Sequence, residues 1–258
     1  MSKIDHPEML TRGLMAHVVR FVFLCQIPIL TPLIIMVYAK IFTADFYHHT
    51  IGEFPNLLAF FLRDRDLGAK MRGVSLSEGM VSPAEGKTAF WDKLSHNDTM
   101  PIKGAGFTVS KLLGFDAPHF QTGIVFYLSP GNYHHVHAPC DLTVEGYFEI
   151  PGKLESVAPA LIKKKPQLFA ENLRHVILAR TSDNRRLAVV LVGAKNVGNI
   201  HCPKLAGFEP ESDISYKKGE LLGYFTLGST VVMLLDEDIP PIMPVGSPID
   251  VLDTLERR

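Results

Sequence analysis

A Gly-Ser pair near the C-terminal end of the chain, Gly228-Ser229, stands between two strand-like apolar runs, residues 221–226 and 231–235. Glycine has no Cβ, so its carbonyl carbon is open to attack by the hydroxyl of the next residue. The attack moves the acyl group from nitrogen to oxygen, and β-elimination of the ester leaves a dehydroalanine that hydrolyses to a pyruvoyl group. Serine is a weak nucleophile, so this route requires a positioned base and an oxyanion donor. A simple bend or bulge between two strands is the alternative interpretation of the same pair.

Candidate bases lie in residues 133–140, which hold three histidines within four positions: His134, His135 and His137. Histidine is the usual general base near neutral pH. On an extended segment, side chains alternate between faces, so we expect His135 and His137 to share one face and His134 to point away from it. Purely structural histidines are the alternative at this stage.

A metal site is a further alternative for these histidines, because Cys140, His201 and Cys202 could add nitrogen and sulfur ligands. No second ligand pair at zinc spacing is present, so we predict no metal. The chain has 3 cysteines, the third being Cys25, and none is in CxxC spacing. An odd number without such spacing argues against a disulfide framework and is typical of a reducing compartment.

The elements that must position these residues are mostly strands. Residues 123–128 and 187–192 are short, apolar and rich in β-formers, which is typical of buried strands. Glu85 lies in residues 81–88, where turn residues are flanked by apolar ones, and a carboxylate there is most often an exposed surface group. We predict an α+β fold with a mainly antiparallel β core and N-terminal and peripheral helices, in which the strand after Ser229 completes the core.

The N-terminal fifth has the composition of a membrane contact. Residues 21–38 carry no formal charge, and these 18 positions are just enough to span a hydrocarbon core. Pro28 and Pro32 interrupt the run, so a kinked span, a shallow hairpin and an in-plane helix are all compatible with it, and a buried core helix is the alternative. We expect residues 1–50 to form a membrane-associated helical segment and residues 51–258 to form the remaining domain on the cytoplasmic side.

Helical spacing returns between residues 54 and 72, and the mixed charges of residues 63–66 predict a solvated helix end.

The chain of 258 residues is long enough for one sizeable domain with an appendage. Its net charge of −1 gives no reason to expect nucleic acid as a partner.

Taken in order, these stretches resemble the phosphatidylserine decarboxylase proenzymes. The resemblance is carried by residues 81–86, 133–139, 191–194, 197–200 and 219–230, and by the apolar N-terminus. It implies a self-cleaving decarboxylase that converts phosphatidylserine to phosphatidylethanolamine and CO2 through an imine with a pyruvoyl group. Cleavage after Gly228 would leave a β chain of residues 1–228 and an α chain of residues 229–258 that carries the pyruvoyl cofactor formed from Ser229.

The same resemblance assigns roles to individual residues. His137 matches the base for self-cleavage, and His134 matches a histidine that acts in decarboxylation. Glu85 stands where the family normally has the aspartate that orients the cleavage histidine. Glutamate keeps the charge but adds a methylene, and a misplacement of about 1 Å can lower a rate about a hundredfold.

The implied partners are a phospholipid substrate and the membrane, the β and α chains of one precursor, and a second copy of the chain in a homodimer. The implied location is the cytoplasmic face of a bacterial inner membrane. Two other functions stay open. One is a decarboxylase of the same family that acts on a soluble amino acid. The other is a non-catalytic, membrane-associated binding protein in which Glu85 marks lost self-cleavage.

Overall fold

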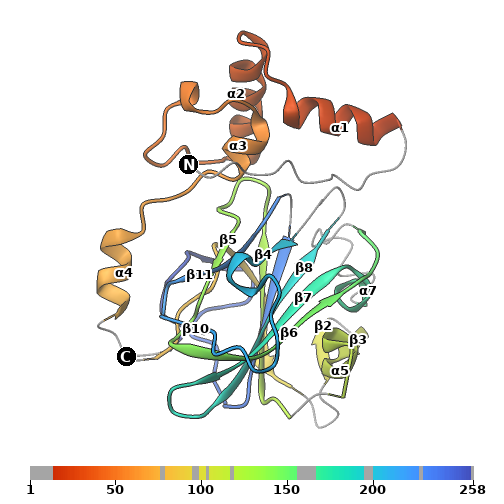
Figure 1. Cartoon of the computed structure of the whole chain (residues 1–258), viewed down its shortest axis with the longest axis vertical. Coiled ribbons are helices and arrows are strands. Elements are labelled where there is room, and N and C mark those ends of the chain that lie inside the picture. The colour runs from red at the N-terminus through yellow and green to blue at the C-terminus, as the bar shows by residue number, and fades with distance from the viewer. Residues whose placement is uncertain are drawn as a thin grey trace.

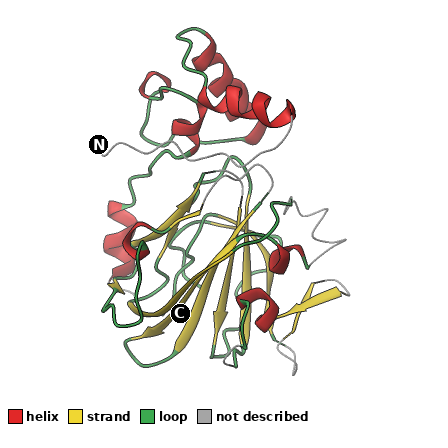
Figure 2. Ribbon diagram, turned by 45° about the vertical axis from the view of Figure 1, so that its right-hand side comes forward, coloured by secondary structure: helices red, strands yellow, loops and turns green. Residues whose placement is uncertain are grey.

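The computed structural model describes residues 14–75, 79–94, 99–102, 105–116, 119–155, 167–194, 200–226 and 229–256. A layer of helices stands on one end of a β body, and shorter helices lie on the sides of that body (Figures 1 and 2). The predicted α+β class with a mainly antiparallel core is confirmed.

The helical elements are α1 (Leu14–Leu24), α2 (Leu30–Phe42), η1 (Ile51–Glu53), α3 (Leu57–Phe61), α4 (Gly68–Ser75), α5 (Val109–Leu113), α7 (Leu168–Glu171) and η2 (Pro203–Leu205). The strands are β1 (Gly86–Lys93), β2 (Thr99–Ile102), β3 (Ala105–Thr108), β4 (Thr122–Leu128), β5 (His135–His137), β6 (Leu142–Ile150), β7 (Arg174–Thr181), β8 (Arg186–Gly193), β9 (Ile200–His201), β10 (Ser215–Tyr216), β11 (Leu221–Phe225), β12 (Ser229–Leu235) and β13 (Pro248–Ile249).

The main sheet has 8 strands in the order β10-β6-β7-β8-β12-β4-β1-β13, with antiparallel neighbours throughout. Its central strand β12 is buried at all seven positions. Alternate residues face two cores: Val231 and Met233 pack in one, while Val232 and Leu234 pack in the other. Because both faces are covered, the strand reads as a continuous apolar run instead of an alternating one.

A smaller sheet, β5-β11-β9, carries the histidine segment. β5 pairs with β11 so that His135 is opposite Tyr224 and His137 is opposite Leu221. β11 then leads toward β12, which starts at Ser229, so the chain passes from the small sheet to the centre of the large one. Leu227 and Gly228 lie outside the described residues.

The uncharged N-terminal run does not form one straight helix. As Pro28 predicts, the helix is interrupted: α1 ends at Leu24 and α2 begins at Leu30. Pro32 is tolerated because it lies in the first turn of α2, where a missing N–H leaves no intrahelical bond unmade. Within the described residues, none of the helices is both long and apolar enough to cross a bilayer.

The helical pattern of residues 54–72 yields two short helices, α3 and α4, with extended chain between them. The predicted solvated helix end at residues 63–66 is wrong for Arg63, which is 2% exposed. Its guanidinium donates to the carbonyls of Asp45 and Gly131, so it holds the helical layer to the turn after β4. A buried guanidinium needs such acceptors because it cannot lose its charge. Helical packing also continues past residue 50, since α3 packs against α1 and α2.

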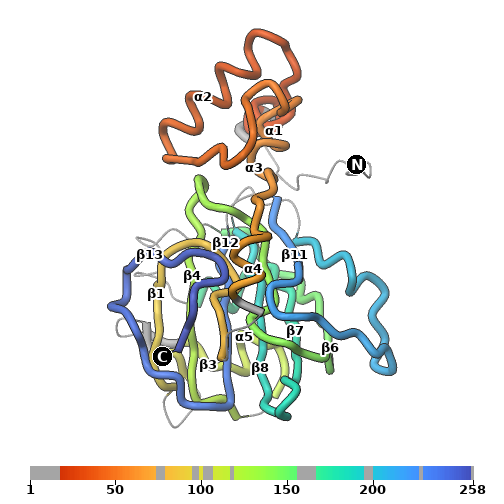
Figure 3. The backbone as a smooth tube through the Cα atoms, turned by 90° about the vertical axis from the view of Figure 1, so that its left-hand side faces the viewer, coloured from red at the N-terminus to blue at the C-terminus, as the bar shows by residue number. Residues whose placement is uncertain are grey.

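The C-terminal segment returns to the side of the body, where it lies beside α4 (Figures 1 and 3). Lys70 of α4 donates to the carboxylates of Asp250 and Asp253 at 2.9 and 2.8 Å. Residues that would belong to different chains after cleavage at Gly228 are therefore paired across this side.

Candidate functional site

Ser229 is the first residue of β12, in register with Leu128 of β4 and Gly193 of β8. Its side chain is buried, and its Oγ has no hydrogen-bond partner among the described residues. The same is true of Oγ1 of the next residue, Thr230. Two neighbouring hydroxyls without partners are unusual in a protein interior and need an explanation, of which a reactive site is one.

His134 is fully buried and has a defined tautomer. Its Nδ1 lies 2.8 Å from the carbonyl oxygen of Asn132, and because a carbonyl only accepts, Nδ1 carries the proton. The lone pair is therefore on Nε2, which is buried and has no partner in the described part of the chain. Burial lowers the pKa of His134 to about 3. The residue is a neutral imidazole with a free proton-accepting atom.

The backbone brings His134 and Ser229 to the same end of the β body. The amide of Phe225 donates to the carbonyl of His134 at 3.1 Å, and the chain reaches Ser229 four positions later, at most about 14 Å away. On the other side, Leu128 pairs with Ser229 and opens the turn that leads to His134. Phe61 of α3 covers the imidazole, with ring centroids 4.1 Å apart. The helical layer thus closes this end of the body over His134.

His137 is held differently. Its Nδ1 lies 2.8 Å from the carbonyl oxygen of Gly219, so Nδ1 carries the proton, and Nε2 accepts from the hydroxyl of Tyr133 at 3.2 Å. Burial lowers the pKa of His137. The Tyr133 ring stacks with both His135 and His137, while His134 packs on Phe61, which confirms the predicted alternation of faces.

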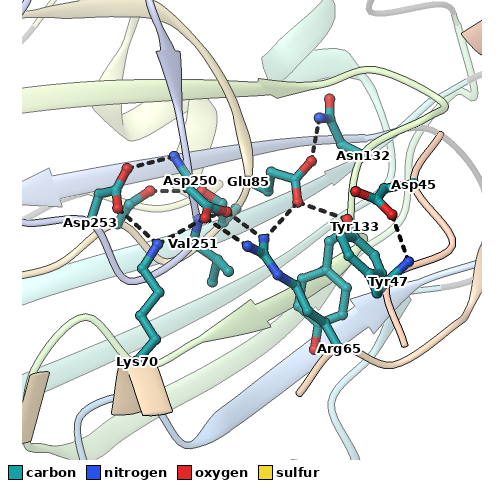
Figure 4. A network of polar contacts seen from close by, with 12 residues as sticks. Asp45, Tyr47, Arg65, Lys70, Glu85, Asn132, Tyr133, Asp250, Val251 and Asp253 are labelled. Carbon is teal, nitrogen blue, oxygen red and sulfur yellow. Dashed lines mark hydrogen bonds and ion pairs between the residues drawn. The ribbon is translucent and has the colours of Figure 1, made fainter. Parts of the chain in front are cut away.

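Glu85 lies just before β1, and its side chain is only partly exposed. Its carboxylate accepts three hydrogen bonds (Figure 4). The donors are Asn132 Nδ2 at 2.7 Å, the Tyr47 hydroxyl at 2.9 Å and Arg65 Nη1 at 3.1 Å. Among the described residues no hydrogen bond joins Glu85 to His137, because Gly219 and Tyr133 occupy both ring nitrogens of that histidine.

Glu85 instead contacts the turn that precedes His134. The Asn132 amide that donates to Glu85 also accepts, through Oδ1, from the backbone N–H and the hydroxyl of Ser129 at 2.8 and 2.6 Å. The backbone carbonyl of the same Asn132 fixes the proton on His134. Glu85 is therefore linked to His134 through one residue.

Three further residues of this region carried no usable signal in the sequence: Tyr47, Arg65 and Asp250. Arg65 donates to both carboxylate oxygens of Asp250, at 2.5 and 2.8 Å, as well as to Glu85, and its guanidinium lies 5.0 Å from the centre of the Tyr47 ring. Figure 4 shows these side chains converging from distant parts of the chain. A cavity of about 530 Å³ borders the network and is lined by polar side chains that include Arg65, Glu85 and Asn132.

Within the part of the chain that the structure describes, the histidines of residues 133–140 belong to no group of three ligating side chains. Within the described residues, one group of ligating side chains brings its atoms within 4.8 Å, and it consists of His48, His49 and Asp64. Cys140 and Cys202 are both buried, and burial raises the pKa of each thiol to about 12, which disfavours the thiolate that metals prefer.

Comparison with known proteins gives a consistent set of relatives. The family model described as phosphatidylserine decarboxylase matches residues 57–255. The phosphatidylserine decarboxylase proenzyme of Coxiella burnetii (strain RSA 493 / Nine Mile phase I) is 36% identical over 218 residues, which cover 76% of this chain and 76% of the relative. The proenzyme of Alcanivorax borkumensis is 33% identical over 249 residues, covering 88% of this chain and 85% of the relative. The matched residues 57–255 include Glu85, His134, His137 and Ser229.

Proposed function

The chain belongs to the phosphatidylserine decarboxylase family, and we propose that it is a proenzyme that cleaves itself between Gly228 and Ser229. Its activity is that of a phosphatidylserine decarboxylase, which releases CO2 from the serine headgroup and leaves phosphatidylethanolamine. The observation that carries the self-cleavage proposal is the Ser229 hydroxyl, which is buried and has no hydrogen-bond partner among the described residues.

Self-cleavage requires the Ser229 hydroxyl to lose its proton as its oxygen attacks the carbonyl carbon of Gly228. The peptide nitrogen then leaves, and an ester joins the two residues until elimination breaks the bond to the serine oxygen. A donor must stabilise the oxygen of the attacked carbonyl, and the Thr230 hydroxyl is available for this because nothing in the described chain already holds it. The Ser229 hydroxyl also has no partner among the described residues, so it can attack without first breaking a side-chain hydrogen bond to one of them.

A pyruvoyl group at position 229 supplies an electron sink for decarboxylation. The described surroundings fit this group, since conversion removes a hydroxyl that is satisfied by no described residue. The start of β12 is held on both sides by β4 and β8, so the position stays ordered when the chain is cut before it.

Two histidines can divide the proton transfers. We assign His137 to the self-cleavage step on the basis of the resemblance. The Tyr133 hydroxyl donates to Nε2 of His137, and this hydrogen bond must be released before Nε2 can accept the serine proton. We assign His134 to turnover, where a proton must reach the substrate carbon after CO2 leaves. Its Nε2 is buried, and its backbone carbonyl accepts from the amide of Phe225 in the strand that leads toward Ser229, which supports this role. Glu85 acts as a positioning residue through Asn132.

After cleavage, the α chain is held without a covalent link. It contributes the central strand β12, which pairs over seven residues with each neighbour. The five apolar side chains of residues 231–235 are fully buried, each at 0% exposure, and each such side chain contributes about 1.5–3 kcal/mol. We therefore propose that the β chain of residues 1–228 and the α chain of residues 229–258 stay together in the native protein.

We further propose that the helical layer binds the membrane that supplies the substrate. Exposed apolar side chains gather on residues 18–42, among them Phe21 at 58%, Ile29 at 88% and Ile41 at 66%. An apolar cavity of about 380 Å³ opens between α1, α2 and α3. Such a face is stabilised by contact with acyl chains.

The division into residues 1–50 and 51–258, the homodimer, and the cytoplasmic face of a bacterial inner membrane stay proposals from the sequence.

The first experiment is the intact mass of the purified protein under denaturing conditions. We expect two chains, the smaller of 30 residues, starting at position 229 and lighter by one ammonia than the serine-ended peptide. Ser229→Ala should give a single uncleaved chain that releases no CO2 from phosphatidylserine vesicles. Ser182→Ala, at an exposed serine, is the control and should mature normally. A Ser229→Ala protein that still decarboxylates would refute the proposal.

The two histidine variants separate maturation from turnover. His137→Ala should remain a single chain, whereas His134→Ala should be cleaved and yet release no CO2. The opposite pattern would exchange the two assignments. Release of CO2 from a soluble amino acid without lipid would favour a decarboxylase of the same family that acts on soluble amino acids. A wild-type chain that never cleaves would favour a non-catalytic binding protein.

A further inference from the structure

A second cluster of chemistry-bearing side chains lies outside the site described above, where the segment after α2 meets residue 64. We propose that His48, His49 and Asp64 bind one divalent transition-metal ion, and zinc is the ion used to test the site. One ligating atom from each lies within 4.8 Å of the others. The cluster is distinct from the Ser229 region and plays no part in the proposed decarboxylation chemistry.

The spacing of the ligating atoms suits a small ion. Nε2 of His49 lies 2.6 Å from Oδ1 of Asp64, and Nε2 of His48 lies 3.8 Å from the same oxygen. Zinc binds imidazole nitrogen and carboxylate oxygen at about 2.0–2.2 Å, which in a tetrahedron puts ligand atoms roughly 3.3 Å apart. The two observed separations lie on either side of this value. A shift of less than about 1 Å would bring each of these two pairs to the zinc spacing.

The orientation of His49 is set by a second carboxylate. Its Nδ1 lies 3.0 Å from Oε2 of Glu53 and its Nε2 lies 2.6 Å from Oδ1 of Asp64, and because both carboxylates accept, both nitrogens donate in this arrangement; a bound ion would replace the proton on Nε2. Glu53 is itself fixed, since its Oε1 accepts from the backbone N–H and the hydroxyl of Thr50 at 3.0 and 2.9 Å. Histidine ligands of metals typically donate their other nitrogen to a carboxylate in this way.

The imidazole rings are also held by packing. The ring of His48 lies against that of His49 with centroids 4.0 Å apart, and the rings of His49 and Phe54 meet in an edge-to-face arrangement with centroids 5.2 Å apart. The His49 side chain is only 15% exposed, whereas the Asp64 side chain is 74% exposed, so an ion can enter from solvent on the aspartate side and keep water there. A pre-arranged site requires less reorganisation on binding than a pair of free side chains.

The ligand types predict which ions bind. Two imidazoles and one carboxylate suit zinc, nickel and copper, whereas magnesium prefers oxygen ligands only. Bound metal would join residues 48 and 49 to residue 64, closing the loop that carries α3. Because Phe61 of α3 covers His134, the ion would stabilise the helical layer over the reactive end of the body.

Isothermal titration of the full chain with zinc chloride at about pH 7.5, after removal of metal by a chelator, tests the proposal. We expect one zinc per chain and no heat from magnesium. His49→Ala and Asp64→Asn should each weaken zinc binding by more than about 100-fold, and Glu53→Gln, which removes only the supporting carboxylate, by about 10–100-fold. His119→Ala, at an exposed histidine elsewhere, is the control and should leave the affinity unchanged.

The Glu53→Gln variant keeps all three ligands. A loss of zinc affinity in this variant would show that His49 binds as part of an ordered site, because zinc bound by separate surface histidines would not depend on Glu53. Circular dichroism of each variant checks that the fold is retained. A cobalt-substituted protein should show the visible absorption of a nitrogen- and oxygen-ligated site, and this absorption should be absent in His49→Ala. The proposal is overturned if zinc gives no saturable heat, or if His49→Ala and Glu53→Gln both bind zinc like the wild type.

Discussion

Arg65 joins three parts of the molecule, so we expect its removal to destabilise the fold far more than removal of an ordinary surface charge. It lies in the segment between α3 and α4, and it pairs with Glu85 of the β body and Asp250 of the C-terminal segment. Asp250 belongs to the proposed α chain. The change that tests this arrangement is Arg65→Ala.

The magnitude follows from the contacts. Arg65 makes three charge-assisted hydrogen bonds, two to Asp250 and one to Glu85. Each is worth about 1.5–3 kcal/mol when buried. The side chains are 23%, 34% and 19% exposed for Arg65, Asp250 and Glu85, which weakens these bonds, and Lys70 still pairs with Asp250 after the change. We therefore expect a loss of about 2–3 kcal/mol in the free energy of unfolding. Arg65→Lys should recover only part, because an ammonium cannot bridge both oxygens of Asp250.

The assay is urea unfolding followed by circular dichroism in a Ser229→Ala background, in which the single chain makes unfolding unimolecular. Arg180→Ala, which breaks the exposed ion pair with Glu145, is the control and should lower the free energy of unfolding by less than about 1 kcal/mol. If Arg65→Ala is no more destabilising than Arg180→Ala, the network does not stabilise the fold as its geometry implies.

The same pair has a defined pH dependence. Burial alone would raise the pKa of Asp250, but hydrogen bonds from Arg65 and Lys70 outweigh it and lower the pKa overall. A carboxylate with a lowered folded-state pKa stabilises the protein above its unfolded pKa of about 4, and this stabilisation is lost as the pH falls through the folded value. The difference between wild type and Arg65→Ala should therefore be full at neutral pH and shrink below about pH 4. A difference that stays constant in acid would exclude the ion pair as its source.

Two further predictions concern the junction and the buried histidine. Gly131→Ala should lower the urea midpoint strongly, because the new Cβ would lie 2.1 Å from the backbone oxygen of Phe42; Gly52→Ala, where nothing lies within 4 Å, is the control, and equal midpoints for the two would contradict the packing. Burial lowers the pKa of His134 to about 3, below the unfolded value of about 6.5, so the unfolded chain takes up protons first and the free energy of unfolding should fall by up to about 1.4 kcal/mol per pH unit below 6.5. Urea unfolding between about pH 7 and 5 should show a shallower fall for His134→Gln, and an identical slope would mean that His134 is not buried as a neutral imidazole.

Much of the fold was predictable because its causes are local. The apolar runs at residues 123–128 and 187–192 predict buried strands, and both lie in the main sheet as β4 and β8. The alternation of His134 against His135 and His137 follows from strand geometry alone and is confirmed by their ring contacts. Pro28 predicts the break between α1 and α2.

Other features could not be predicted because their causes lie far away in the chain. The charges of residues 63–66 resemble a solvated helix end, yet Arg63 is buried against the carbonyl of Gly131, 68 positions away. Glu85 resembles an exposed turn residue, yet it bonds Tyr47 and Asn132. Charge and polarity in the sequence say that a side chain needs a partner, and they do not say which one the fold supplies.

The sequence by itself predicted the Gly228-Ser229 pair as the reactive site, and it determined the family and the strand that carries Ser229, because residue types and short-range periodicity are sufficient for these. Only the tertiary structure decided that Glu85 is connected to His134 through Asn132, that His137 is bound by Tyr133 and Gly219, and that Arg65 joins Asp250 across 185 positions. Hydrogen bonds and ion pairs act over a few ångströms, so their partners are set by how the elements pack and not by their order in the chain.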